Sequence, residues 1–234
     1  MHLAADRRRR PKAVKAIINP MKRKGSLRAA LAGAVLGAML PLGLVGCGEP
    51  ESEADRIRRL GREGKVDALA EKIKAADPET ARLAVRCLAQ AGEKAQPVVR
   101  EAMDDPRAQV RAETALVYPR VAKRPEAQKR LGDLARRDPE ARVRGSAVRA
   151  LGQMRGLEQM ETLLTALDDP DPLVRHLASE AVSRIMGQRY ELNLNGPAEK
   201  RRQDIARLRK VWQRWKGTVR GYYRGRIEHQ RKNR

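Results

Sequence analysis

The sequence predicts an all-α protein, a right-handed solenoid of about five helix pairs. A short motif that begins Asp-Pro and ends Val-Arg recurs at 105–111, 138–144 and 169–175. The copies start 33 and 31 residues apart, and self-similarity at such a period is typical of a repeat architecture. Aromatic residues make up only 3% of the chain, which disfavours a fold built on strands.

Each copy of the motif is expected to contribute two helices. Apolar residues recur at helical spacing after the motif, as in Leu177, Ala181 and Ile185, and again in the segment between motifs, as in Met160 and Leu164. No window alternates like a strand. The helix pairs are expected at about 54–76, 78–104, 106–137 and 139–168, and at 171–187 with 197–216.

The sequence also predicts how the repeat helices begin and end. Asp105, Asp138 and Asp169 are expected to be N-caps, because an aspartate can accept the unpaired amides of the first turn and the proline after each suits the first helical position. Gly152 and Gly187 are expected to end their helices, since glycine adopts the left-handed conformation of a C-terminal cap.

The motif resembles HEAT repeats, in particular the short phycobilisome-lyase-like class, in which an Asp and an Arg stand six residues apart. This spacing is matched by Asp105 and Arg111, Asp138 and Arg144, and Asp169 and Arg175. The resemblance implies a HEAT-like or armadillo-like superhelix over 56–196, in which these side chains form a structural ladder between successive repeats. A degenerate copy at Asp77 and Arg82 departs from this spacing.

Positive charge is concentrated at the two ends of the chain. The formal net charge is +22, of which residues 1–46 carry +9, residues 47–196 carry +2 and residues 197–234 carry +11. The near-neutral middle is therefore expected to be the folded body. Each basic end needs an explanation of its own.

The N-terminal end is laid out like an export signal. A stretch of 17 uncharged residues, 29–45, follows a basic segment and runs into Leu-Val-Gly-Cys at 44–47. This ending resembles the lipobox of bacterial lipoproteins. The resemblance implies cleavage between Gly46 and Cys47 and attachment of a lipid to the thiol of Cys47.

On this interpretation residues 1–46 are a removed targeting segment, with translation starting at Met21, and residues 47–55 are an acidic tether. The mature chain would be a membrane-anchored lipoprotein of the cell envelope, in the outer membrane or periplasm where a second membrane exists. More than one acyl chain would make its anchoring stable.

The C-terminal end combines a predicted capping helix with basic residues. A helix over 197–216 would cover the last repeat with its apolar face, and residues 217–234 are expected to be a basic disordered tail. The candidate anion-binding residues of helix and tail are Arg207, Lys210, Arg214, Arg220, Tyr222, Tyr223, Arg224 and Arg226. Arginine beside tyrosine suits nucleic acid, anionic lipid headgroups or a phosphate-bearing envelope polymer. Export would favour the last two ligands.

No pattern typical of catalysis or metal binding occurs in the sequence. His2, His176 and His229 have no partners at ligand spacing, and nucleotide-binding, hydrolase and redox motifs are absent. Cys87 lies among apolar residues of a repeat helix and is expected to be a buried, inert thiol. We therefore expect no enzymatic activity, no cofactor, no metal and no small-molecule substrate.

Functions from different classes remain open. The first is an exported, lipid-anchored scaffold that binds an unidentified protein on the solenoid face. The alternative is a cytoplasmic nucleic-acid-binding protein that uses the basic C-terminal helix and tail. A lyase-like activity is a second alternative, implied only by the class that the repeat unit resembles.

Overall fold

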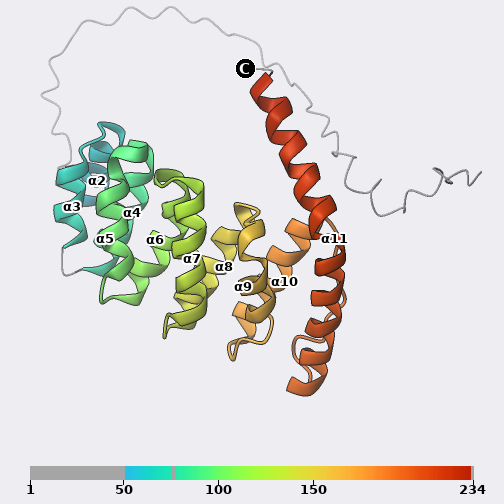
Figure 1. Cartoon of the computed structure of the whole chain (residues 1–234). Coiled ribbons are helices and arrows are strands. Elements are labelled where there is room, and N and C mark those ends of the chain that lie inside the picture. Colours follow the sequence, from blue (N-terminus) through green and yellow to red (C-terminus); the bar gives the residue numbers. More distant parts are fainter. Residues whose placement is uncertain (1–50, 75–76, 233–234) are drawn as a thin grey trace, which may run out of the picture. The chain divides into compact units, whose positions relative to one another are not determined.

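The structure is a computed structural model that describes residues 51–74 and 77–232, with side chains described as far as residue 221. The chain divides into two units, 1–52 and 53–234. The second unit is described here (Figure 1), and all its regular elements within the described residues are helices. The predicted all-α solenoid is confirmed.

The helices follow one another in pairs along the second unit. The first helices of the pairs are α2 (Glu53–Arg62), α4 (Pro78–Leu88), α6 (Ala108–Val121), α8 (Ala141–Gln153) and α10 (Pro172–Met186). Their partners are α3 (Val66–Ile73), α5 (Gln96–Glu101), α7 (Arg124–Arg137), α9 (Met160–Ala166) and α11 (Ala198–Lys232). Short 3-10 turns at Ala89–Ala95, Ala102–Asp104 and Leu157–Gln159 flank α5 and α9.

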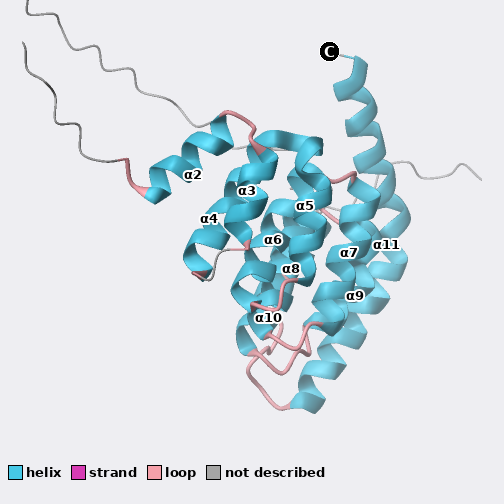
Figure 2. Ribbon diagram, turned by 90° about the vertical axis from the view of Figure 1, so that its left-hand side faces the viewer, coloured by secondary structure: helices cyan, strands magenta, loops and turns pink. Residues whose placement is uncertain are grey.

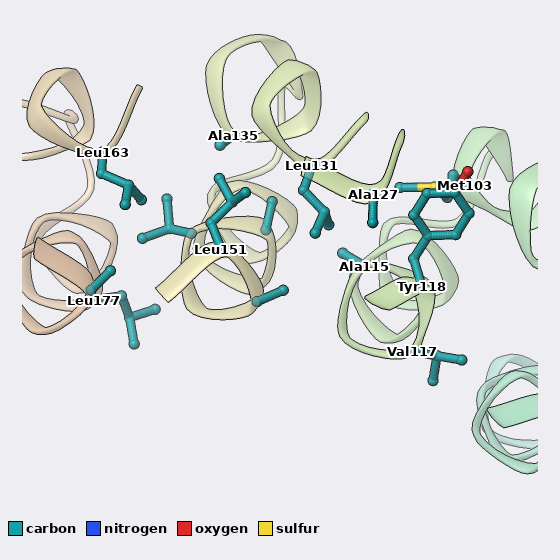
Figure 3. Packing of buried hydrophobic residues seen from close by; sticks show 14 of the residues in the cluster. Met103, Ala115, Val117, Tyr118, Ala127, Leu131, Ala135, Leu151, Leu163 and Leu177 are labelled. Atoms are coloured by element: carbon teal, nitrogen blue, oxygen red, sulfur yellow. The ribbon is translucent and has the colours of Figure 1, made fainter. Parts of the chain in front are cut away.

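The helices of this unit form two rows (Figures 1 and 2). One row contains α4, α6, α8 and α10, in which each helix packs against the next, and the other contains α5, α7, α9 and α11. The core lies between the rows, where Tyr118, Leu131, Leu151 and Leu163 are fully buried (Figure 3). Because one apolar cluster runs from Ile57 to Trp212, each repeat is stabilised by its neighbours.

The motif aspartates lie just before their helices and are not N-caps, contrary to the sequence prediction. Asp105 and Asp138 precede α6 and α8 by three residues, and each accepts the backbone N–H two positions further on, at 2.8 and 3.0 Å. In the last repeat the N-cap is Asp171, which accepts two amides of the first turn of α10, while Asp169 accepts the N–H of Asp171. The motif aspartate thus shapes the turn that precedes the helix.

Of the two glycines that were expected to end helices, only Gly187 does so, with a φ of 77° at the C-cap of α10. Gly152 lies inside α8, and Arg155 with a φ of 52° supplies the left-handed residue after that helix. A Cβ added at Gly152 would lie 2.7 Å from Cβ and 2.9 Å from Cα of Ala181 on α10. Gly152 is therefore required for the close approach of two motif helices.

The C-terminal helix is longer than predicted. The sequence predicted a helix over 197–216 and a disordered tail over 217–234, whereas α11 is a single helix of 35 residues, Ala198–Lys232. Disorder was expected from the basic composition of this segment, but Gly217 and Gly221 are isolated glycines, each of which costs only about 1 kcal/mol in a helix. At the other end α2 begins at Glu53, inside the predicted tether.

The contact at Gly152 generates a prediction. Gly152→Ala is expected to lower the free energy of unfolding by about 1–2 kcal/mol, because the new methyl group would force the backbones of α8 and α10 apart. The matched control is Gly217→Ala on α11, where nothing lies within 4 Å of the added Cβ. That change should raise the stability of the helix by up to about 1 kcal/mol. Urea unfolding measures both effects, and a gain at Gly152 would contradict the close approach.

Candidate functional site

The motif residues of successive repeats join in hydrogen-bonded pairs. Arg111 on α6 donates to both carboxylate oxygens of Asp138 in the next repeat, at 2.9 and 3.0 Å. Arg144 on α8 binds both oxygens of Asp169 in the same way, at 2.8 Å each. Such two-point contacts fix direction as well as distance, so each pair sets the position of one repeat on the next.

The same arginines also bind their own repeat. The Nη1 atom of Arg111 donates to the carbonyl oxygens of Asp105 and Pro106, at 2.9 and 3.0 Å. Arg144 makes the equivalent contacts with the motif that precedes it. The spacing of six residues therefore places one guanidinium where it closes the turn of its own motif and reaches the aspartate of the next.

The pairing changes at both ends of this ladder. Asp105 is bound by Arg107 of its own motif, whose hydrogen bond holds the pKa of the carboxyl below its usual value. Arg175, the last motif arginine, donates its Nε to the carbonyl oxygen of Leu194 at 2.8 Å. In the degenerate first copy Asp77 caps α4, and Arg82 forms an ion pair with Glu79. Because Arg175 binds a backbone carbonyl where Arg111 and Arg144 bind an aspartate, the ladder ends at Arg175.

The ladder is a structural element. The side chains of Arg111 and Arg144 are each only 13% exposed, and those of Asp138 and Asp169 are buried. Every charged group in the two pairs already has its partners. Because these groups are enclosed and satisfied, they hold the repeats together and leave ligand binding to other surfaces.

A row of exposed side chains lies on α6, α8 and α10. Counted from the motif arginine of each helix, the residues two before, five after and nine after fall on one helical face. These positions hold Gln109, Leu116 and Arg120 on α6, Arg142, Arg149 and Gln153 on α8, and Leu173, Glu180 and Arg184 on α10. We call these nine residues the motif-helix face. All are exposed except Leu116, which is half-buried.

Two grooves adjoin this face. One, of about 220 Å³, lies between α8 and α10 and is bordered by Arg149, Gln153, Glu180 and Arg184, with Gly152 and Ala181 also in its lining. The other, of about 650 Å³, lies on the opposite side of α10, next to the segment 187–190. Glu180 and Arg184 border both grooves and form the ridge between them.

The long helix α11 presents an apolar face to the last repeat. Ile205, Leu208 and Trp212 are buried there, whereas Trp215 is half-buried. The predicted apolar face of the capping helix is thus in contact with the core along its first turns.

A second face of α11 is bound to α9 by ion pairs. Arg209 pairs with Glu161 at 2.9 Å and Arg220 with Glu158 at 3.0 Å, while Arg201 reaches Asp168 just beyond α9 at 2.8 Å. Arg220 was a candidate for anion binding, and the structure instead places it against Glu158, in the 3-10 turn just before α9.

A third face of α11 is exposed and basic. It holds Lys200, Arg207, Lys210 and Arg214, at the spacing of one helical stripe. Arg207 pairs with Asp204 of the same helix, whereas no ion pair of Lys210 or Arg214 occurs among the described residues. Of the other candidates, Tyr222, Tyr223, Arg224 and Arg226 belong to α11 by their backbone, and their side chains lie beyond the described ones.

The predicted lipidation site lies outside the described residues, with Gly46, Cys47, Met21 and the rest of the targeting segment. Cys87 is buried in α4, and burial raises the pKa of its thiol. In the described part of the chain no group of His, Cys, Asp or Glu side chains could hold a metal ion. Within the same part, no helix has the length and apolar character that crossing a bilayer requires.

The motif-helix face was missed by sequence reasoning. Arg142 and Arg149 were not singled out, because an arginine on a helix gives no sign by itself of whether it is paired. The signal was available, since writing the three motif copies above one another places these residues in register with Leu173 and Glu180.

Comparison with known families supports the repeat interpretation. Residues 128–194 match the family model of HEAT repeats. The match includes the second and third complete motifs and the arginine–aspartate pair between them. No curated protein matches the chain.

The ladder generates a second prediction. Arg144→Met is expected to lower the free energy of unfolding by about 3–5 kcal/mol, because it leaves the buried carboxylate of Asp169 without its countercharge. Arg175→Met removes the equivalent side chain at the end of the ladder, where the acceptors are backbone carbonyls. It should cost about 1–2 kcal/mol. Thermal unfolding followed by circular dichroism measures both, and equal losses would contradict a special role for the pair.

Proposed function

We propose that this protein is a HEAT-repeat scaffold that binds a partner protein on its motif-helix face. Stacked helical repeats expose a continuous surface whose residues are contributed by several units, and HEAT repeats commonly mediate the binding of protein partners. The observation that carries the proposal is the row of exposed side chains and adjoining grooves on α6, α8 and α10. The proposed activity is binding and involves no catalysis or cofactor.

The proposal includes export and a lipid anchor. It rests on the order of basic segment, uncharged stretch and Leu-Val-Gly-Cys at 44–47, which resembles a lipoprotein signal. Attachment at Cys47 would leave only a few residues between the membrane and the start of α2 at Glu53. The scaffold would then act at the cell envelope.

The exposed basic stripe of α11 favours a second candidate function. Lys200, Arg207, Lys210 and Arg214 face away from the repeats and would attract an anionic surface. In an exported chain that surface would be anionic lipid or an envelope polymer. In a cytoplasmic chain it would be nucleic acid, and the protein would be a nucleic-acid-binding repeat protein.

The scaffold proposal predicts crosslinks from one row of helices. A photo-crosslinking residue placed at Ser146, between Arg142 and Arg149 on α8, should give a discrete adduct with one protein in intact cells. The control is the same residue at Lys129, which is exposed on α7 in the other row. An adduct of equal strength from Lys129 would contradict binding on the motif-helix face.

The location predicts the fate of a cysteine variant. The intact chain should fractionate with membranes and begin, in the mass spectrum of its mature form, at a lipid-modified Cys47. Cys47→Ala should be lost from that fraction, because the acyl chains are its membrane anchor. A soluble cytoplasmic protein that retains residues 21–46 would overturn the anchor and favour the nucleic-acid alternative.

A further inference from the structure

The motif-helix face is positively charged, whereas the repeats as a whole are nearly neutral. Its nine residues include four arginines and one acid, Glu180, while the whole segment 47–196 has a net charge of only +2. The four arginines are Arg120, Arg142, Arg149 and Arg184. The nine residues of this face therefore have a net charge of +3, more than that of the whole segment.

These arginines differ from those of the ladder in having no countercharge. In the described part of the chain Arg120, Arg142, Arg149 and Arg184 form no ion pair and are exposed. On the neighbouring helix α4, by contrast, Arg86 is held by both carboxylate oxygens of Glu113, at 3.0 and 2.9 Å. Unpaired guanidinium groups keep all their donors available, and their fork geometry matches a carboxylate.

The spacing of the face fits an extended peptide. Packed helices lie about 8–10 Å apart, so equivalent positions on α6, α8 and α10 recur at that interval. Arg120 and Arg184 occupy equivalent positions, nine residues after the motif arginine, whereas Arg149 is five residues after it and lies about one helical turn from their row. An extended chain rises about 3.3 Å per residue, and its every third residue advances about 10 Å. A peptide that crosses the three helices with an acidic residue at every third position would therefore present one carboxylate to each helix.

The grooves and the exposed apolar side chain of Leu173 add to this fit. The groove between α8 and α10 includes the small residues Gly152 and Ala181 in its lining, which leave room for a peptide backbone. Leu173, which is 62% exposed, occupies the same register position on α10 as Arg142 on α8. An apolar residue of the peptide can cover Leu173.

We propose that the motif-helix face binds an extended acidic segment of a partner protein, whose carboxylates pair with Arg120, Arg149 and Arg184. This inference rests on the proposed scaffold function and specifies the chemistry of its partner. Glu180 borders the same groove as Arg149 and Arg184, and one of its carboxylate oxygens lies 3.2 Å from Nε2 of His176 on the same helix. A continuous polyanion would be repelled there, whereas a peptide can place an uncharged residue opposite Glu180.

The test measures binding of a labelled peptide to the full chain by fluorescence anisotropy. The probe carries aspartate at every third position and serine elsewhere, and a second probe of the same composition has its aspartates in one block. The spaced probe should bind more tightly than the block. Replacing Arg120, Arg149 and Arg184 together by Gln should weaken binding of the spaced probe by at least about tenfold.

The matched control removes the same charge from the other row of helices, at α7 and the residue before it. Replacing Lys123, Lys129 and Arg137 together by Gln should change the affinity by no more than about twofold, because these exposed residues lie away from the site and screened charges contribute little there. Circular dichroism verifies that both variants fold. Equal weakening by the two variants, tighter binding of the block or no binding of the spaced probe would overturn the proposal.

The crosslink from Ser146 separates this inference from the function on which it rests. Loss of the adduct in the variant of Arg120, Arg149 and Arg184 is the expected result. An adduct that persists in that variant would leave the scaffold function standing and show that the partner is not held by its acidic residues. Absence of the adduct from the unaltered chain would contradict the scaffold function itself.

Discussion

The two-point contact between an arginine of one repeat and an aspartate of the next determines how the helices of this protein are placed. A helix pair of about 30 residues buries too little apolar surface to be stable alone, so it depends on correct contact with its neighbours. Apolar packing supplies most of that stabilisation, but it has no direction and tolerates sliding. Because Arg111 and Arg144 each bind a carboxylate through two hydrogen bonds and close the turn of their own motif, they fix one position of each repeat on the next.

This division of labour explains why arginines in one helix have different roles. Arg144 and Arg149 both lie on α8, the second five positions after the first. The first is enclosed between repeats with every donor satisfied, and the second faces solvent beside a groove. A charged group inside the stack must have a partner within the chain, since an unpaired one would be costly to bury. A charged group on the outer face is solvated by water and can remain unpaired until another molecule binds it.

The sequence predicted the architecture better than the surfaces. Periodicity at 105, 138 and 169 was sufficient for the helix pairs, because apolar spacing and repeated motifs are local patterns. The predicted N-cap role of Asp105 was wrong. Its side chain accepts the amide of Arg107 in the turn before α6, and the sequence alone does not distinguish this contact from a cap on the first turn of the helix. The prediction that Gly152 ends its helix was also wrong. A glycine is needed there because Ala181 of the next repeat lies too close for a side chain. The continuation of α11 to Lys232 escaped prediction because the basic composition of 217–234 was interpreted as disorder, although a basic segment can also be helical.

The contact of Arg175 with the carbonyl oxygen of Leu194 has a consequence for the size of the protein. In the preceding repeats the equivalent Nε binds an aspartate that opens a further copy of the motif, so each repeat provides the attachment point of its successor. Here a backbone atom of the segment before α11 occupies that point, and the basic helix follows in place of another motif. The ladder of arginine–aspartate pairs therefore ends at Arg175. Lengthening the array would require an Asp-Pro motif in place of this segment, which makes the junction at 188–196 the natural site for designing versions with more units.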